Sequence, residues 1–217
     1  MADAFGSHVR ASIPLYDLGH ELACDLRSFF RRRGGNAYEI GCATGELLWC
    51  LAGSVPESRR VLWVGIDLEP AMVARARERC ADRANVEVEV ADARDHPFRA
   101  SDFMVAFLTM HFVRRDERPA LVRRLYEALT PGGALLLFEK VRSPDARLQD
   151  LVTALHTRFK RRQGLSAEEI LNKVESLTGV IDPLTSEENA SLLGAAGFTS
   201  MSSVLRYLCF EAVLAVK

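Results

Sequence analysis

The sequence predicts an α/β fold in which helices wrap a mostly parallel sheet that ends in an antiparallel hairpin. Short apolar runs alternate with helical stretches from residue 37 to residue 139. Val61–Asp67 is almost wholly apolar, which is typical of a parallel strand buried on both faces. Phe198–Arg206 and Leu208–Val216 are β-prone runs with almost nothing between them, so they can pair only as a hairpin. We therefore expect one domain, residues 1–217, built on a doubly wound sheet of seven strands.

Each element follows from its own pattern. Residues 1–33 are expected to form a helical cover, with apolar residues at helical spacing over Leu15–Arg32. The elements predicted after it are the strand Ala37–Gly41, the helix Glu46–Ser54, the strand Val61–Asp67, the helix Ala71–Arg83, the strands Val86–Val90 and Phe103–Leu108, the helix Glu117–Leu129, a turn at Thr130–Gly133 and the strand Ala134–Glu139. Residues 142–190 break the alternation, and we expect two or three polar helices there that cover the site.

Composition limits the possible partners and the compartment. The formal net charge is -1, so no overall positive field exists to attract nucleic acid, and nucleic-acid binding is disfavoured. No apolar run is long enough to span a membrane, and the first residues do not resemble a secretory signal. The five cysteines are scattered without a Cys-x-x-Cys pair, which favours reduced thiols in the cytoplasm. No metal site is predicted.

A glycine loop follows the first predicted strand, at Glu39-Ile40-Gly41-Cys42-Ala43-Thr44-Gly45. Gly41 permits a tight turn and a close backbone approach, and Gly45 permits a helix to begin near a ligand. The spacing is neither that of the dinucleotide fingerprint nor that of a phosphate loop. It therefore favours a ligand without a pyrophosphate, although an ordinary strand-to-helix turn has the same pattern.

Two aspartates end the next two predicted strands, where ligands of open α/β sheets bind. Asp67 can accept hydrogen bonds from both ribose hydroxyls of a nucleoside, or it can cap the helix that begins near Pro70. Asp92 can accept from an adenine amino group, or it can simply solvate a loop. The backbone N–H of Ala93, the residue after Asp92, can reach a ring nitrogen of the adenine, and Leu68 after Asp67 is expected to contact the same ligand.

The loop and the two acids, in this order on three successive strands, resemble the motifs of class I S-adenosylmethionine (SAM)-dependent methyltransferases. The resemblance implies a Rossmann-like methyltransferase fold with SAM as cofactor. The residues expected to contact it are Tyr16, Glu39, Gly41, Cys42, Ala43, Gly45, Asp67, Leu68, Asp92, Ala93 and Phe107.

A narrower resemblance covers nearly the whole chain, from about Ser12 to the C-terminus. It is carried by Ile13-Pro14-Leu15-Tyr16, Gly41-Cys42, Ile66-Asp67 with Pro70-Ala71-Met72, Thr130-Pro131-Gly132-Gly133-Ala134-Leu135 with Glu139-Lys140, and His156-x-x-Phe159-Lys160-Arg161 with Gly164 and Ser166. These residues are similar to those of the carboxy-S-adenosyl-L-methionine synthase family, which acts in bacterial tRNA wobble-uridine modification and uses SAM and prephenate. The resemblance implies that Tyr16 lines the SAM pocket. It also implies a homodimer in which the insert lies near the partner subunit.

Two positions depart from that family. The family holds the added carboxylate with an arginine on an insert helix, where this chain has Val174, which cannot make a charge-assisted bond. Lys173 and Arg162 are possible substitutes, but neither aligns with the arginine. The family has an asparagine at the end of the fourth strand, where this chain has Phe107. Both changes concern the sulfonium end of SAM, so SAM binding carries over better than the type of reaction.

Three residues are candidates for the chemistry. Tyr16 is expected in the site, Phe107 can attract a sulfonium by a cation–π interaction or pack in the core, and His111 can act as a general base or simply line the pocket. His156 lies in a basic run with Arg158, Lys160, Arg161 and Arg162, which either binds an anionic acceptor or forms a solvated helix face.

Several functions remain open at this point. The main hypothesis is a methyltransferase that acts on a small molecule, in specialised metabolism. One alternative is synthesis of carboxy-SAM with a different carboxylate anchor. Another is cyclisation of SAM itself to azetidine-2-carboxylate with release of methylthioadenosine. The non-enzymatic alternative is a SAM-binding regulator or partner subunit.

Overall fold

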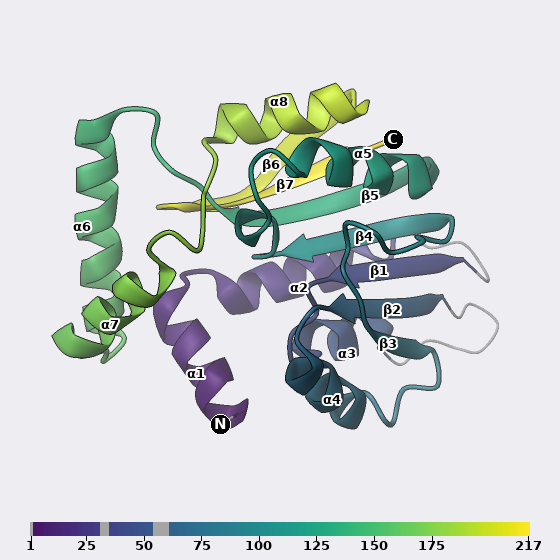
Figure 1. The fold of residues 1–217 in the computed structure, drawn as a ribbon, viewed down its shortest axis with the longest axis horizontal. Coiled ribbons are helices and arrows are strands. Elements are labelled where there is room, and N and C mark those ends of the chain that lie inside the picture. Colours follow the sequence, from purple (N-terminus) through teal and green to yellow (C-terminus); the bar gives the residue numbers. More distant parts are fainter. Residues whose placement is uncertain (1, 31–34, 54–60) are drawn as a thin grey trace.

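The computed structural model describes residues 2–30, 35–53 and 61–217, and its centre is one seven-stranded sheet (Figure 1). The strand order is β3-β2-β1-β4-β5-β7-β6. The first five strands in this order are parallel, and β7 runs antiparallel between β5 and β6. The strands are β1 (Asn36–Ile40), β2 (Leu62–Asp67), β3 (Val86–Val90), β4 (Ser101–Phe107), β5 (Leu129–Lys140), β6 (Ser200–Tyr207) and β7 (Phe210–Val216). The predicted Rossmann-like methyltransferase sheet with a terminal hairpin is confirmed.

Helices cover both faces of the sheet because its central strands are apolar on both sides; every residue of β4 is buried. One face packs against α2 (Tyr16–Leu26) and α3 (Glu46–Ala52). The other face packs against α5 (Arg118–Ala128) and α8 (Ser186–Ala196). Next to β2 and β3 lies α4 (Pro70–Arg79). Because the helices cover the two faces, the carboxyl ends of the parallel strands remain open at one edge of the sheet, where a ligand can bind.

The N-terminal cover is two helices where the sequence predicts a single helix over Leu15–Arg32. The first helix, α1, is Ala2–Ser12, and the chain turns through Pro14 before α2 begins. Pro14 disfavours helical backbone at the residue before it, which separates the two helices. The second helix, α2, ends at Leu26, earlier than predicted, and residues 31 and 32 of the prediction lie outside the described residues.

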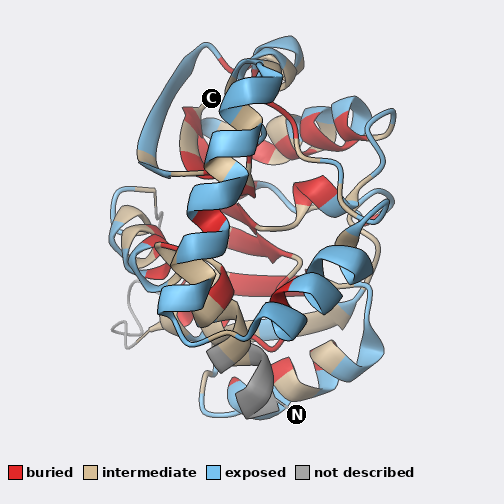
Figure 2. Cartoon of the chain, turned by 90° about the vertical axis from the view of Figure 1, so that its left-hand side faces the viewer, coloured by how far each residue is buried: buried red, intermediate tan, exposed pale blue. Residues whose placement is uncertain are grey.

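The insert contains the predicted helices, but its boundary differs. Beyond the carboxyl ends of the parallel strands lie α6 (Ala146–Arg162) and α7 (Ala167–Leu177), beside α1 (Figure 1). Seen from that side, α6 crosses in front of the buried strands (Figure 2). The third helix, α8, begins inside the predicted insert and packs on α5 over the sheet instead of over the site. Within the described residues, no helix is both long and apolar enough to cross a membrane.

Two sequence-based expectations are wrong. The turn predicted at Thr130–Gly133 is part of β5, because Gly132 and Gly133 exchange backbone hydrogen bonds with Lys217 at the end of the hairpin. The five cysteines are not all free thiols: Cys24 on α2 and Cys50 on α3 form a disulfide, with their Cα atoms 6.5 Å apart. Packing of α2 on α3 brings these two residues together, and their spacing in the sequence gave no sign of it. The remaining three cysteines, Cys42, Cys80 and Cys209, are buried free thiols.

Candidate functional site

A cavity of about 840 Å³ lies beyond the carboxyl ends of the parallel strands. The segments that follow β1, β2, β3 and β4 form its floor, and α1, α2, α6 and α7 contribute its other walls. This is where ligands bind in open α/β sheets. The predicted loop and both predicted aspartates meet here.

The loop after β1 is shaped by two glycines with different roles. Gly41 has a φ of 75°, and a Cβ there would lie 2.4 Å from Oγ1 of Thr109. Thr109 Oγ1 in turn donates to the carbonyl of Ile40, which holds the loops after β1 and β4 together. Gly45 lies outside the cavity lining, and a Cβ there would collide with Ala76 of α4. Gly41 thus shapes the ligand wall, while Gly45 lets α3 and α4 pack.

Glu39 places a carboxyl oxygen without a hydrogen-bond partner in the cavity wall. The side chain is buried, and its Oε2 has no hydrogen-bond partner among the described residues. Burial, with a further contribution from nearby Asp67, raises the pKa of Glu39 well above its ordinary value. A buried polar atom without a partner costs free energy, so this wall favours a ligand that donates hydrogen bonds or carries positive charge.

Asp67 is held at the end of β2 by two backbone donors. Its Oδ2 accepts from the N–H of Ala43 at 2.8 Å, and its Oδ1 accepts from the N–H of Glu69 at 2.9 Å. The helix N-cap is Glu69, whose side chain accepts from Ala71, so the capping alternative for Asp67 is wrong. A carboxylate has about four acceptor sites, which leaves Asp67 able to accept from ligand hydroxyls.

Asp92 lines the cavity after β3 in an ion-pair network. Its carboxylate accepts from the guanidinium of Arg94, with Nη2 2.6 Å from Oδ2. Arg94 also donates to Glu117 at 2.7 Å. These hydrogen bonds with Arg94 lower the pKa of Asp92. Most of its acceptor capacity is used within the protein, a constraint on the predicted adenine contact that the sequence did not indicate.

Three aromatic rings meet on the wall beside β4. The ring centroids of Tyr16 and His20 on α2 lie 5.6 and 4.9 Å from that of Phe107, both edge-on. Phe107 stacks on Phe138 at 4.4 Å, and Gly19 allows α2 to come this close, since a Cβ there would lie 2.9 Å from the Phe107 ring. Burial raises the pKa of Tyr16 and lowers that of His20 to about 4. The rings are therefore uncharged at neutral pH, and such a wall can attract a cation without repelling it.

His111 lies in the lining with its ring held by Glu139. Its Nδ1 hydrogen-bonds to the buried Glu139 carboxylate, which also accepts from the backbone N–H groups of Thr109, Met110 and His111. A ring oriented by a carboxylate keeps its other nitrogen for a ligand or proton. The geometry suits either a positioned base or a fixed wall of the pocket, the two roles that the sequence left open.

Contacts with α2 and α3 on one side and with α6 on the other hold the N-terminal helix α1 over the cavity. Arg10 pairs with Asp17 at 2.7 Å and with Glu46 of α3, and its guanidinium lies over the ring of Tyr16. On the other side, Nε2 of His156 on α6 bonds to the carbonyl of Ser12 at 2.8 Å. His156 is thus a buried structural contact, and the interpretation of this run as a wholly solvated helix face is wrong at that residue.

The structure brings together ten of the eleven expected cofactor contacts and all three catalytic candidates. Those in the cavity lining are Tyr16, Glu39, Gly41, Cys42, Ala43, Asp67, Leu68, Asp92, Ala93, Phe107 and His111, and Gly45 is the one outside it. His20 was missed, although its position four residues after Tyr16 places both on one helix face. Lys140 and Lys160 also line the cavity; Lys140 was quoted only as part of a motif, and Lys160 was named only within the basic run that either binds an anion or is solvated.

The departure at Val174 has a structural counterpart. Val174 is half exposed and lies outside the lining, whereas its neighbour Lys173 lines the cavity from α7. Of the two basic substitutes considered from the sequence, Lys173 is therefore at the cavity, whereas Arg162, like the aligned valine, lies outside its lining.

Comparison with known proteins agrees with this geometry. A family model described as "Methyltransferase domain" matches residues 37–133. The chain is 30% identical to the carboxy-S-adenosyl-L-methionine synthase of Staphylococcus epidermidis, covering 100% of this chain and 93% of the relative. It is 34% identical to that of Chromohalobacter salexigens, covering 98% and 80%. The chain belongs to the carboxy-S-adenosyl-L-methionine synthase family. It is a SAM-dependent, transferase-like enzyme of methyltransferase fold.

The fold also resembles solved structures. The YcgJ protein of Bacillus subtilis superposes with a TM-score of 0.69 at 13% identity, covering 93% of this chain and 99% of that one.

The cavity fits SAM, the ligand of the family. The free Oε2 of Glu39 suits the ammonium of SAM, Asp67 suits its ribose, and the uncharged aromatic wall suits its sulfonium.

Proposed function

We propose that this chain makes carboxy-SAM from SAM and the dicarboxylate prephenate. The observation that carries this proposal is similarity over the full chain, including α6 and α7, to relatives named for that product. Methyl transfer to a small acceptor, the main hypothesis from the sequence, has less support because the relatives that match the whole chain are named for carboxy-SAM synthesis, and the methyltransferase model matches only residues 37–133. The expectation of specialised metabolism rests on the sequence alone.

The reaction requires both ligands to share one cavity. A C–H bond of the SAM methyl group is replaced by a C–C bond to a carboxyl carbon. Prephenate loses that carboxyl group and its ring hydroxyl and becomes phenylpyruvate, while the methyl proton and the hydroxyl leave as water. The protein has to position the two ligands and exclude bulk solvent, and cover by α1, α6 and α7 serves both purposes.

Product analysis tests the proposal. Purified protein is incubated with SAM alone and with SAM plus prephenate, and the products are identified by mass spectrometry. A SAM-derived species heavier by a carboxyl group, formed only with prephenate and together with phenylpyruvate, supports the proposal. Prephenate left unconsumed while SAM is converted would refute it.

A second candidate is cyclisation of SAM to azetidine-2-carboxylate, which the absence of an arginine at Val174 and the aromatic Phe107 favour. The amino nitrogen would attack Cγ, the C–S bond would break with its electron pair on sulfur, and methylthioadenosine would leave. The attacking amine has to lose a proton first, and the raised pKa of the buried Glu39 suits a proton acceptor. Methylthioadenosine and a new amino acid in the tube with SAM alone would support this candidate.

We also propose that the chain works as a homodimer through the outer side of α6. The family resemblance suggests this, and Leu148, Leu151 and Leu155 support it, since they recur at helical spacing and are each at least 43% exposed. Three exposed leucines in one row form an apolar surface that a second copy of the chain can cover.

A further inference from the structure

Lysine is rare in this protein, and its placement is uneven. Of the 28 basic residues only four are lysines: Lys140, Lys160, Lys173 and Lys217. The first three line the cavity, while Lys217 caps backbone carbonyls at the other end of the sheet. A chain that uses arginine almost everywhere else thus has three lysines at one site.

The three lysines come from three different elements. Lys140 ends β5, where it pairs in register with Phe210 of β7. Lys160 is in the last turn of α6, and Lys173 is on α7. Lys140 and Lys160 are half-buried. The folding of the insert over the sheet is what brings their charges together, so spacing in the sequence could not reveal the cluster.

In the part of the chain that the structure describes, no acidic side chain pairs with these lysines. Among the described residues, none of the three ammonium groups makes an ion pair or a side-chain hydrogen bond. Burial, followed by repulsion from Lys140 and a smaller effect of Lys173, lowers the pKa of Lys160. The nearest titratable neighbours do not compensate, because burial keeps the Cys209 thiol and His156 neutral at physiological pH. Like charges gathered in a half-buried wall cost free energy unless an anion joins them.

The cluster lies on the far side of the aromatic wall from the SAM-binding acids. In the strand order, β4 with Phe107 stands between β1, which carries Glu39, and β5, which carries Lys140. Adjacent strands are about 4.8 Å apart, so β1 and β5 are separated by about 10 Å. Phe107 pairs with Phe138, two residues before Lys140. A ligand on the lysines would therefore face the aromatic wall from the side opposite Glu39.

We propose that Lys140, Lys160 and Lys173 form the binding site for the carboxylate groups of an anionic co-substrate. This deepens the proposed function, on which it rests for the choice of prephenate as the ligand. Lys173 then supplies on α7 the positive charge that Val174 lacks. More than one ammonium suits a dicarboxylate, since each can donate to a separate carboxylate oxygen.

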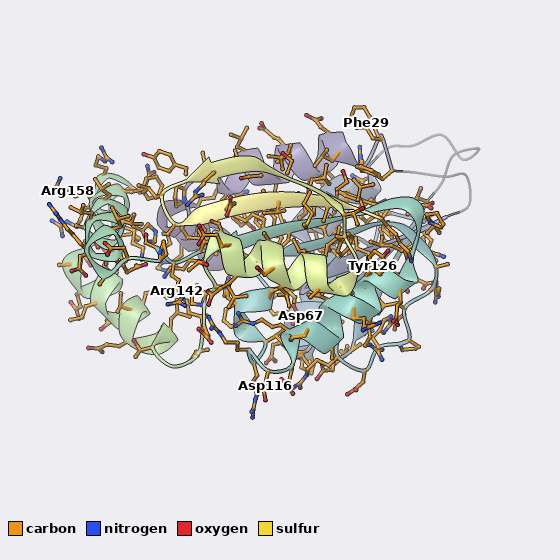
Figure 3. All side chains as sticks on the ribbon, turned by 90° about the horizontal axis from the view of Figure 1, so that it is seen from above. Phe29, Asp67, Asp116, Tyr126, Arg142 and Arg158 are labelled. Carbon is orange, nitrogen blue, oxygen red and sulfur yellow. A yellow bond between two sulfur atoms is a disulfide. The ribbon has the colours of Figure 1, made fainter. Side chains whose placement is uncertain are left out.

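Calorimetry on protein saturated with S-adenosylhomocysteine tests the site without turnover. Prephenate is titrated into the wild type, into the double variant Lys160→Met/Lys173→Met, and into Arg142→Met. Arg142 is the control because it is an exposed basic residue outside the cavity lining that pairs with Glu188 of α8 (Figure 3). The double variant should bind prephenate at least tenfold more weakly, whereas the affinity of Arg142→Met for prephenate and the affinity of all variants for S-adenosylhomocysteine should change less than twofold.

Three results would overturn the site: no prephenate binding by the wild type, equal binding by the double variant, or a parallel loss of S-adenosylhomocysteine. The last would mean that the lysines hold the carboxylate of SAM itself.

Thermal melting adds a second readout. Because Lys160→Met removes a charge that its neighbours repel, the variant should keep or raise the melting midpoint of the unliganded protein. A lower midpoint would indicate a structural lysine instead. Binding without carboxy-SAM synthesis would leave the site standing and refute only the proposed function. Carboxy-SAM synthesis with an unchanged KM for prephenate in the double variant would do the reverse.

Discussion

The ring of His20 meets the ring of Phe107 edge-on, with their centroids 4.9 Å apart. Burial lowers the pKa of His20 to about 4, so this contact brings no charge to the cavity at neutral pH. An asparagine in place of Phe107, as the family resemblance implies, would remove the ring that both His20 and Tyr16 contact. The contacts of the aromatic wall therefore depend on Phe107.

Phe107→Leu should reduce the preference of the protein for SAM over S-adenosylhomocysteine. The two ligands differ by the methyl group and the sulfonium charge, and a cation–π interaction contributes about 0.5–2 kcal/mol. The ratio of the two dissociation constants should change by roughly 2- to 30-fold, mainly through weaker SAM binding. Calorimetry with both ligands measures this ratio. Equal losses for both would show that Phe107 only packs in the core.

Glu39→Gln should stabilise the unliganded protein and yet weaken SAM binding. Because the pKa of Glu39 is raised on folding, its contribution to stability is lost as pH rises from about 4.3 through the folded-state pKa. Glutamine cannot ionise, so the variant should melt higher than the wild type at neutral pH, and the difference should vanish near pH 4. Melting across this pH range, with SAM titrations at neutral pH, checks both effects. A variant that melts lower and binds normally would remove Glu39 from the SAM site.

Asp67→Ala should weaken SAM binding by at least tenfold, roughly 1.4 kcal/mol or more. The variant loses the acceptors for the ribose and also the bonds that fix Ala43 and Glu69. Asp116→Ala is the control, since Asp116 is exposed and pairs with Arg114 on the surface. Unchanged affinity in the first variant, measured by calorimetry, would exclude Asp67 from ribose binding.

The order of helices and strands could be predicted because each core strand is a short apolar run that is visible in the sequence. Every predicted strand matches an observed one within two residues at its ends, except that β5 begins five residues before the predicted Ala134. The sequence failed where distant contacts decide the structure. Helix α1 contains Gly6, a weak helix former, and Arg10 stabilises it by reaching Asp17 and Glu46. The disulfide between Cys24 and Cys50 likewise depends on the packing of α2 against α3.

The site shows the same division. The loop at Gly41 and the acids at Asp67 and Asp92 could be found because each follows a recognisable strand. The hydrogen bond between Asp92 and Arg94 could not be predicted, because the sequence does not show whether a charged side chain will face solvent or pair with a neighbour. The lysine cluster was missed for a related reason, because its members lie on three separate elements.

Acid should destabilise the protein partly through its buried histidines. The pKa of His156, like that of His20, is lowered by burial from 6.5 to about 4. Between about pH 6.5 and pH 4 these histidines are protonated in the unfolded chain but remain neutral in the folded protein. The free energy of unfolding therefore decreases as pH falls from about 6.5 toward 4. Each ring contributes up to about 1.4 kcal/mol per pH unit in this window. His156→Gln should show a shallower dependence in urea unfolding between about pH 5 and pH 7, and an unchanged slope would contradict this.

Leu151→Glu should convert the proposed dimer into a monomer. Leu151 is 54% exposed in the middle of the leucine row on α6, so a glutamate there would place a charge in the centre of the proposed interface. Burying an unpaired carboxylate costs far more than one leucine contributes. Light scattering after size-exclusion chromatography measures the mass. Leu18→Glu is the matched control, because Leu18 is 46% exposed but lies on α2, away from the row. A wild-type mass of a single chain, or a Leu151→Glu variant that remains dimeric, would contradict the proposed interface.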